Sequence, residues 1–260
     1  MGHKVHPKSY RIGTTVTWPS RWFARDKAYI ENTRQDLLIR DFFKKQLKDA
    51  GLSNVFIERM RGALIVTLAT AKPGLVIGHQ GTGIEDLKKK FLRQFFPGKK
   101  VQFQLNVSEV AKASLEATVV AQQVIADIER RMPFRRVLKM AIERVKKAGA
   151  QGVKIAVSGR LNGAEIARRE WLAWGKIPLS NLRADIDYCQ DFAHTMMGAI
   201  GVKIWIYRGD VFAKDRRDLY APSTPRAPGG RRPEMGGRPH GDRRPHMGGR
   251  DDRRHERPER

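Results

Sequence analysis

The chain has 260 residues, with 51 Lys and Arg against 27 Asp and Glu, which gives a formal net charge of +24. A body this basic repels itself unless a polyanion neutralises it, so nucleic acid is the first candidate partner and an anionic membrane surface the second. No apolar run approaches the ~20 residues of a membrane span. The basic N-terminus has no apolar stretch, so we expect no signal peptide. The single cysteine, Cys189, excludes an internal disulfide. We therefore expect a protein of the cytoplasm or an organelle matrix, with no membrane partner.

The sequence of the first half predicts a basic arm over residues 1–33 and a small α/β domain over residues 34–110. A helix fits "DLLIRDFFKKQLKDAG", where Gly51 can end it. The segments "VFIERM" and "ALIVTLAT" predict a hairpin around Arg61–Gly62, and "VQFQLNV" alternates as a closing strand.

Between the hairpin and the closing strand lies "KPGLVIGHQGTGIEDLKKKF". A P-loop is excluded because Ile84 and Glu85 follow the last glycine, where that motif needs Lys and then Ser or Thr. A dinucleotide fold is excluded because the order is G-x-x-G-x-G and the preceding "PGLVI" fits a short helix better than a strand.

The remaining phosphate-binding interpretation is the GxxG loop of a KH domain, which clamps a single strand through its backbone. The candidate residues are Gly78, His79, Gln80 and Gly81, with Lys88 and Lys89 on the helix that follows. A purely structural helix–turn–helix is the alternative, and Thr82 with Glu85 fits a capping box. The two strands before the loop and the strand after it favour the KH domain.

The second half, residues 111–212, predicts two helices followed by four strands, hence two helices packed on one face of a mostly antiparallel sheet. The whole fold class is therefore α+β. Residues 213–260 are rich in Arg, Gly and Pro and have little to bury, so we expect a disordered tail. The irregular spacing of its histidines does not fit a metal site.

A basic run marks the second of these helices. Residues 130–147 hold eight bases and a single acid, Glu143, which is spaced to pair with Lys139 or Lys147. We interpret this run as a phosphate track rather than a plain solvated face. The candidate RNA contacts in and beside it are Arg130, Arg131, Arg135, Arg136 and Lys139.

The segment "SGRLNGAEIARREW" adds Arg160, Arg168 and Arg169 beside small residues, which let a backbone approach RNA closely. A glycine hairpin with exposed arginines explains the segment equally well. Trp171, Trp174 and Trp205 could stack on bases, although tryptophans serve more often in packing.

Catalysis finds no support in the sequence, which has no nucleophile elbow, metal-ligand spacing or cofactor motif. Asp185 and Asp187 adjoin Arg183, and we expect a paired-charge surface there. We therefore expect no enzyme activity, no metal, no cofactor and no small-molecule substrate.

Several long segments resemble one family, the bacterial small-subunit ribosomal proteins numbered three. They are "MGHKVHP", "AKPGLVIGHQG", "RRMPFRR", "SGRLNGAEIARREW" and "LRADIDY" with "IGVKIWIYRG", and the resemblance covers residues 1–212. It implies a type II KH domain, a second two-layer α/β domain, and a place in the head of the small subunit. One departure is that His79 and Gln80 stand where this family usually has a Lys or Arg.

The resemblance also implies partners: small-subunit rRNA, mRNA near its entrance, and the head proteins numbered ten and fourteen. It assigns the opening of mRNA structure to Arg135, Arg136 and Lys139. We thus expect a structural constituent of the cytoplasmic ribosome that positions mRNA for translation. The alternatives are a free KH-domain regulator of RNA and, less supported, an NTPase or nuclease.

Overall fold

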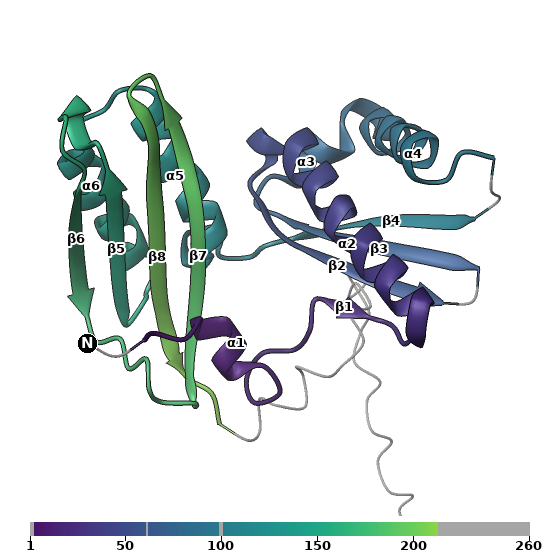
Figure 1. The fold of residues 1–260 in the computed structure, drawn as a ribbon, viewed down its shortest axis with the longest axis horizontal. Helices are drawn as coiled ribbons and strands as arrows, with labels where there is room; N and C mark the ends of the chain where they lie inside the picture. The colour runs from purple at the N-terminus through teal and green to yellow at the C-terminus, as the bar shows by residue number, and fades with distance from the viewer. Residues whose placement is uncertain (1–2, 61, 99–100, 213–260) are drawn as a thin grey trace, which may run out of the picture. The chain divides into compact units, whose positions relative to one another are not determined.

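The computed structural model of the protein describes residues 3–60, 62–98 and 101–212. The described residues form two four-stranded sheets, each with its own helices and its own hydrophobic core (Figure 1). None of the described helices is long and apolar enough to cross a membrane. The expected hairpin residue Arg61 and the expected disordered tail lie outside the described residues.

The N-terminal segment is more ordered than the sequence suggested. It forms α1 (Pro7–Arg11) and the short strand β1 (Ser20–Arg21), which pairs in parallel with β2 (Leu52–Met60). Helix α2 (Asp26–Gln46) begins eight residues before the expected boundary. The buried carboxylate of Asp36 holds the N-terminal segment to α2, because it accepts hydrogen bonds from Ser20 Oγ at 2.8 Å and Trp22 Nε1 at 2.7 Å.

The first sheet has the strand order β1-β2-β3-β4 and the mixed pairing of a type II KH domain. Strands β2 and β3 (Ala63–Thr70) pair antiparallel, whereas β3 and β4 (Gln102–Glu109) pair in parallel. The other elements in chain order are η1 (Lys48–Ala50), α3 (Pro73–Ile77), η2 (His79–Gly81) and α4 (Thr82–Phe95). The predicted order of helix, hairpin, short helix, loop, helix and strand is confirmed.

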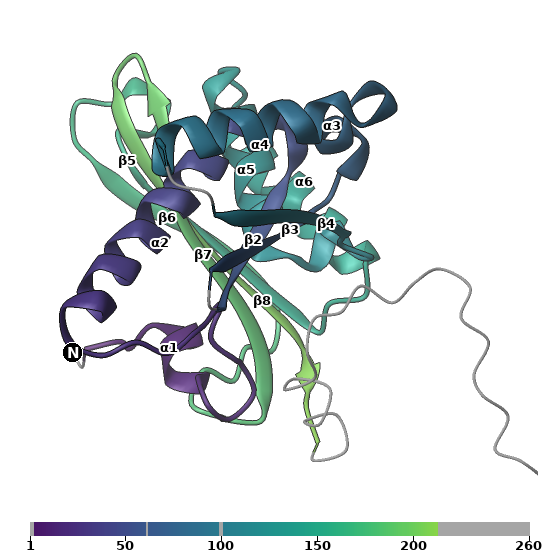
Figure 2. The ribbon, with the colours of Figure 1, turned by 90° about the vertical axis from the view of Figure 1, so that its right-hand side faces the viewer.

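Aromatic residues hold the helices of this unit to its sheet. The Phe91 ring of α4 stacks on Phe103 of β4 at 4.2 Å between centroids and on Phe43 of α2 at 5.8 Å. Figure 2 shows α4 lying over β3 and β4. Because burial of aromatic area dominates core energetics, this cluster fixes α4 and therefore the glycine loop that precedes it.

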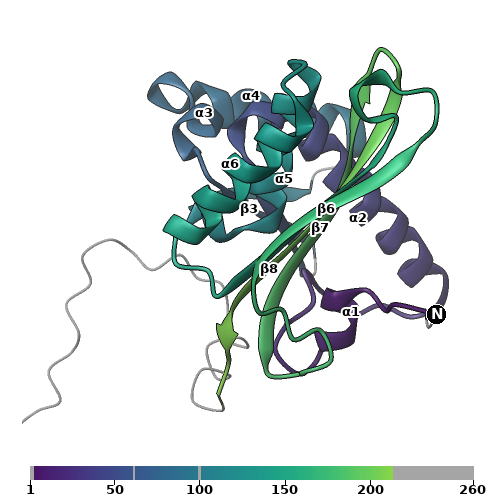
Figure 3. The ribbon, with the colours of Figure 1, turned by 90° about the vertical axis from the view of Figure 1, so that its left-hand side faces the viewer.

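The second sheet has the order β6-β5-β8-β7, and all of its neighbouring strands pair antiparallel. Its elements are η3 (Ala113–Leu115), α5 (Ala117–Glu129), α6 (Phe134–Lys147), β5 (Gly152–Gly159), η4 (Leu161–Gly163), β6 (Arg168–Gly175), β7 (Ala184–Thr195) and β8 (Gly198–Asp210). Both α5 and α6 cover one face of the sheet (Figure 3). The predicted layer arrangement is confirmed.

The core of the second unit lies between the sheet and its two helices. Val153, Ile155 and Val157 of β5 are buried, as are alternate residues of β8 and the apolar stripe of α6. Strand β6 starts only at Arg168. The preceding residues turn through η4, where Asn162 has a φ of 56°.

The expected paired-charge surface around Asp185 and Asp187 is wrong for Asp187, which is only 6% exposed. Its carboxylate accepts a hydrogen bond from the amide of Ala117, at the start of α5. It also pairs with Lys8 Nζ at 2.7 Å and with Arg208 at 3.3 Å. Asp187 is therefore a structural anchor that joins α1, α5 and β8.

Candidate nucleic-acid interface

The glycine loop connects α3 to α4. Its two glycines are required for different structural reasons. Gly78 has a φ of +70°, and a Cβ there would lie 2.9 Å from the amide nitrogen of Gly83. Gly81 has a φ of +83°, yet a Cβ there would meet no atom within 4 Å. Gly78 thus permits the close approach of two helices, whereas Gly81 permits the turn and leaves the surface above it open.

Between the glycines, His79 and Gln80 are exposed, and Gln80 has a φ of 52°. The predicted capping box is wrong, because Thr82 Oγ1 donates to the carbonyl of His79 at 2.8 Å and Gly81 occupies the N-cap position. No side chain caps the start of α4. The amide of Thr82 donates to the carbonyl of His79, and no side chain caps the amides that follow it. The positive end of the helix dipole faces the loop.

The following turns of α4 carry the two predicted lysines. Lys89 is exposed and Lys88 is half-buried, while Leu87 and Phe91 face the core. The alternation of core and charged positions is that of an amphipathic helix. Helix α4, which directly follows the glycine loop, therefore presents positive charge to the solvent.

Helix α6 carries the second group of predicted site residues on its solvent face. Arg135, Arg136 and Lys139 are exposed, and so are Arg130 and Arg131 just before the helix. Among the described residues no ion pair forms at Arg136 or Lys139, and Glu143 pairs with neither of the lysines that its spacing suggested.

Arg135 differs from its neighbours because it has an acidic partner. Its Nε lies 3.2 Å from Glu170 Oε2 of β6, and a second nitrogen donates to Oε1 at 3.3 Å. Glu170 raises the pKa of Arg135 through the hydrogen bond and the ion pair. Arg168 pairs with the same carboxylate at 3.2 Å. Of the three α6 residues Arg135, Arg136 and Lys139, the first is thus paired with an acid, and the other two have no acidic partner among the described residues.

The three arginines of the "SGRLNGAEIARREW" segment point to different places. The Nε of Arg160 donates to the carbonyl of Ala164 at 2.9 Å, which closes the η4 turn. Arg168 lies on the helix-covered face of the sheet, beside the Phe134 ring. Arg169 stands opposite Ser158 and therefore on the other face. The structure does not gather these arginines into one site.

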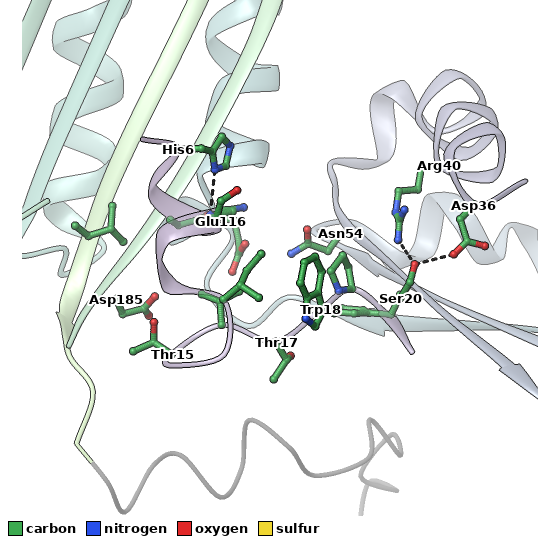
Figure 4. A pocket seen from close by; sticks show the side chains of 18 of the residues that line it. His6, Thr15, Thr17, Trp18, Ser20, Asp36, Arg40, Asn54, Glu116 and Asp185 are labelled. Atoms are coloured by element: carbon green, nitrogen blue, oxygen red, sulfur yellow. Dashed lines mark hydrogen bonds and ion pairs between the residues drawn. The ribbon is translucent and has the colours of Figure 1, made fainter. Parts of the chain in front are cut away.

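A cavity of about 880 Å³ is lined by none of the predicted site residues. Its lining includes Trp18 and Asn54, and Figure 4 shows Ser20, Asp36 and Arg40 joined there by hydrogen bonds. These polar groups satisfy one another. We therefore assign these three residues a structural role. The described residues contain no cluster of His, Cys, Asp and Glu that fits a metal ion.

Two further bases were missed by the sequence reasoning. Lys154 and Lys203 occupy the sheet face opposite the helices, in register with Trp205 and Ala156 respectively. The signal was present in "VKIAVSG" and "VKIWIYRG", because each lysine alternates with buried residues and so must face away from the core.

The fold and its exposed backbone loop define a class of protein: an RNA-binding protein built on a type II KH domain. Comparison with protein families agrees, because residues 38–115 match the KH domain and residues 124–206 match the family described as ribosomal protein S3, C-terminal domain.

Relatives are alike over nearly their whole length. The chain is 42% identical over 235 residues to small ribosomal subunit protein uS3 of Prochlorococcus marinus strain MIT 9211, which covers 90% of this chain and 96% of the relative. It is 46% identical over 218 residues to uS3 of Carboxydothermus hydrogenoformans, covering 84% and 96%. It is 44% identical over 227 residues to uS3c of Pyropia yezoensis, covering 86% and 98%. The chain belongs to the family of small ribosomal subunit protein uS3.

Membership confirms the coarse expectations from the sequence. The chain is a structural protein of the small ribosomal subunit, and its family implies that it binds rRNA. The family is one of ribosomal structural proteins rather than enzymes. In bacteria such a protein is part of the ribosome, in the cytoplasm.

Proposed function

We propose that this protein holds small-subunit rRNA in the head of the subunit and contacts mRNA at its entrance through α6, positioning it for translation. The observation that carries the proposal is the solvent face of α6, where Arg136 and Lys139 are exposed and without an acidic partner among the described residues. Bases in this state bind phosphate by releasing counterions, at no cost of a broken ion pair. The head proteins numbered ten and fourteen are the proposed neighbours.

The glycine loop is the second proposed RNA contact. Open space above Gly81 lets a sugar-phosphate chain approach the backbone, and the uncapped start of α4 offers amide donors to it. The loop lacks a Lys or Arg at residues 79 and 80. Its grip on RNA therefore depends on backbone groups rather than on a fixed positive charge.

The α6 surface acts passively in this proposal. It has no nucleophile and no metal ligands, so it cannot do work on a duplex. It can hold strands that another motor has separated, because phosphate contacts stabilise whichever strand lies on them. The proposed role is thus to keep mRNA in place as it enters.

The salt dependence of RNA binding tests the α6 contact. Arg136→Ala and Lys139→Ala should each lower the slope of log K against log salt by about 0.7 for a single strand. Lys45→Ala, at an exposed position on α2, is the matched control and should leave the slope unchanged. Equal slopes for all variants would contradict the proposal.

The loop is tested by placing Asp at residues 79 and 80 together. Both side chains are exposed, so the variant should keep its fold. Two negative charges above the loop should repel phosphate and weaken single-strand binding several-fold. An unchanged affinity with an intact fold would mean that the loop is only a turn.

Assembly distinguishes the proposed function from a free KH regulator. The chain should sediment with small subunits, and ultraviolet crosslinking of bound mRNA should mark peptides of α6. If the chain sediments mainly as a free protein, or if mRNA crosslinks avoid α6 in assembled subunits, the proposal of an mRNA contact is wrong.

A further inference from the structure

The face of the second sheet that α5 and α6 leave uncovered has no role in the function proposed above. Figure 1 views the sheet from this side, with both helices behind it, and Figure 3 shows helices and α1 on opposite sides. We call it the open face. It is defined by the outward residues of β6, β5, β8 and β7, whose register the hydrogen bonds fix.

Two exposed aromatic rings stand on the outer strands of the open face. Trp171 of β6 is 57% exposed and Phe192 of β7 is 51% exposed. Between them the register places small residues, with Trp171 opposite Ala156 and Phe192 opposite Gly201. Ser158 lies opposite Gly201 on the two middle strands. Both aromatic side chains therefore keep about half of their surface exposed.

The same face carries only positive charge. Lys154, Lys203 and Arg169 point outward here, and no Asp or Glu occupies an outward position between residues 169 and 173, 154 and 158, 201 and 205, or 188 and 192. Lys154 Nζ lies 4.7 Å from the centre of the Trp171 ring. Burial, with Lys4 and Arg169 nearby, lowers the pKa of Lys154.

The N-terminal segment covers only one end of the open face. The His6 ring meets Tyr188 edge-on at 4.8 Å, and Ala184, Ile186 and Tyr207 are buried there as a small separate core. Trp171 and Phe192 lie toward the other end of their strands and stay exposed. The uncovered part is therefore the part that combines aromatic rings with unopposed bases.

We propose that the open face binds single-stranded RNA, with bases stacked on Trp171 and Phe192 and phosphates held by Lys154, Lys203 and Arg169. Like charges gathered without acids are stabilised by a polyanion. Exposed aromatic rings offer stacking to unpaired bases, whose faces are hidden in a duplex. The site is separate from the glycine loop and from α6, so it does not depend on the function proposed above.

The test uses the full chain with His79→Asp and Gln80→Asp together, which lowers the contribution of the loop to the measured RNA binding. The probe is a fluorescein-labelled ten-nucleotide oligo(U), titrated at low salt. Trp171→Ala should weaken binding by about 5- to 150-fold, the range of one stacking interaction. Phe192→Ala should weaken it too, and Trp171→Phe should restore most of the affinity because a ring remains.

Phe23→Ala is the matched control, since Phe23 is 83% exposed and also lies beside a base, Arg25, but outside the open face. It should not change the affinity. A blunt ten-base-pair RNA duplex should bind Trp171→Ala and its parent equally. The proposal is overturned if Trp171→Ala binds oligo(U) as well as its parent, if Phe23→Ala loses as much, or if the duplex shows the same loss.

An independent readout is ultraviolet crosslinking of the same oligo(U), followed by mapping of the attached peptide. The peptide that contains Trp171 should carry the label. If oligo(U) labels other peptides only, the RNA proposal is wrong. Binding of an acidic peptide such as polyglutamate to the open face would then indicate a protein partner.

Discussion

Two groups of charged residues in this protein have opposite fates. On α6, Arg136 and Lys139 are exposed and have no acidic partner among the described residues. Around β7 and β8, Arg11 is fully buried and Arg208 is surrounded by Glu116, Asp187 and Asp185. The first group can exchange counterions for an external polyanion, whereas the second already has its partners inside the fold, backbone carbonyls for Arg11 and carboxylates for Arg208. A basic composition therefore does not by itself identify the bases that bind RNA.

Arg11 is the extreme case of the buried group. Its guanidinium donates to the carbonyls of Pro7, Pro178, Leu179, Asn181 and Ala184 at 2.8–3.3 Å. No carboxylate takes part in these bonds. Arg11 thus holds α1 to the segment that leads into β7. Its planar guanidinium offers more donors in a fixed geometry than a lysine ammonium would.

The largest expected effect comes from removing Arg11. Arg11→Ala leaves several buried carbonyls without donors and should lower the free energy of unfolding by about 4 kcal/mol. Arg11→Lys should cause a smaller loss in the free energy of unfolding than Arg11→Ala, since an ammonium keeps three of the donors. Urea unfolding measures both, with Arg93→Ala on the exposed side of α4 as a control within about 0.5 kcal/mol. A loss for Arg11→Ala no larger than the control would place Arg11 with the dispensable surface bases.

Arg208 provides the second test of the buried group. Burial would lower the pKa of its guanidinium, but Glu116, Asp187 and Asp185 outweigh it and raise that pKa. Arg208→Met removes the cation and leaves three acids facing one another, so we expect a loss of about 2–3 kcal/mol in the free energy of unfolding. Equal stability of variant and parent at pH 7 would show that these ion pairs contribute nothing.

The sequence predicted the features that repeat at short range. The apolar stripe of α6 and the alternation in β5 and β8 gave the second core and the solvent face of α6 correctly. The glycine spacing and its flanking elements gave the KH domain. These patterns are legible because the helical and strand periods reveal which side is buried.

The missed features depend on contacts distant in sequence. The partners of Arg11 on β7 and its preceding loop are 167–173 residues away, so nothing near Arg11 marks it as buried. Strand β1 has only two residues and is held by pairing with β2 and by Asp36. The pairing of Arg135 with Glu170 spans 35 residues. Periodicity cannot reveal such pairs, and they decide which bases remain available.

A smaller effect should separate the bases of α6 from one another. Arg136→Ala should lower affinity for single-stranded RNA by about three- to tenfold, and Arg135→Ala by less, because Arg135 already pairs with Glu170. Glu170→Gln should raise affinity by freeing Arg135. Fluorescence anisotropy with a labelled oligonucleotide measures all three. If Arg135→Ala lowers the affinity more than Arg136→Ala does, RNA displaces Glu170 from Arg135. The ion pair would then not prevent a base of α6 from binding RNA.

The smallest expected effect concerns Asp185, the acid of the buried group that fits it least well. Burial raises the pKa of its carboxyl, and although Arg208 acts in the opposite direction it does not compensate. An acid whose pKa is higher in the folded protein binds its proton more tightly there. Its contribution to stability is therefore present below the unfolded pKa, about 3.9, and is lost as pH rises through the folded value.

Asp185→Asn removes that loss while keeping the size of the side chain. Relative to its parent, the variant should gain stability as pH rises from about 4 to 7, and at pH 7 it should be at least as stable in urea unfolding. Asp49→Asn, at an exposed position, controls for the removal of one acid. A variant that is instead less stable at pH 7, with the deficit growing as pH rises, would mean that the ion pair with Arg208 outweighs burial. Asp185 would then stabilise the fold through its ion pair with Arg208. All three acids that face Arg208 would belong to the group of charges whose partners lie inside the fold.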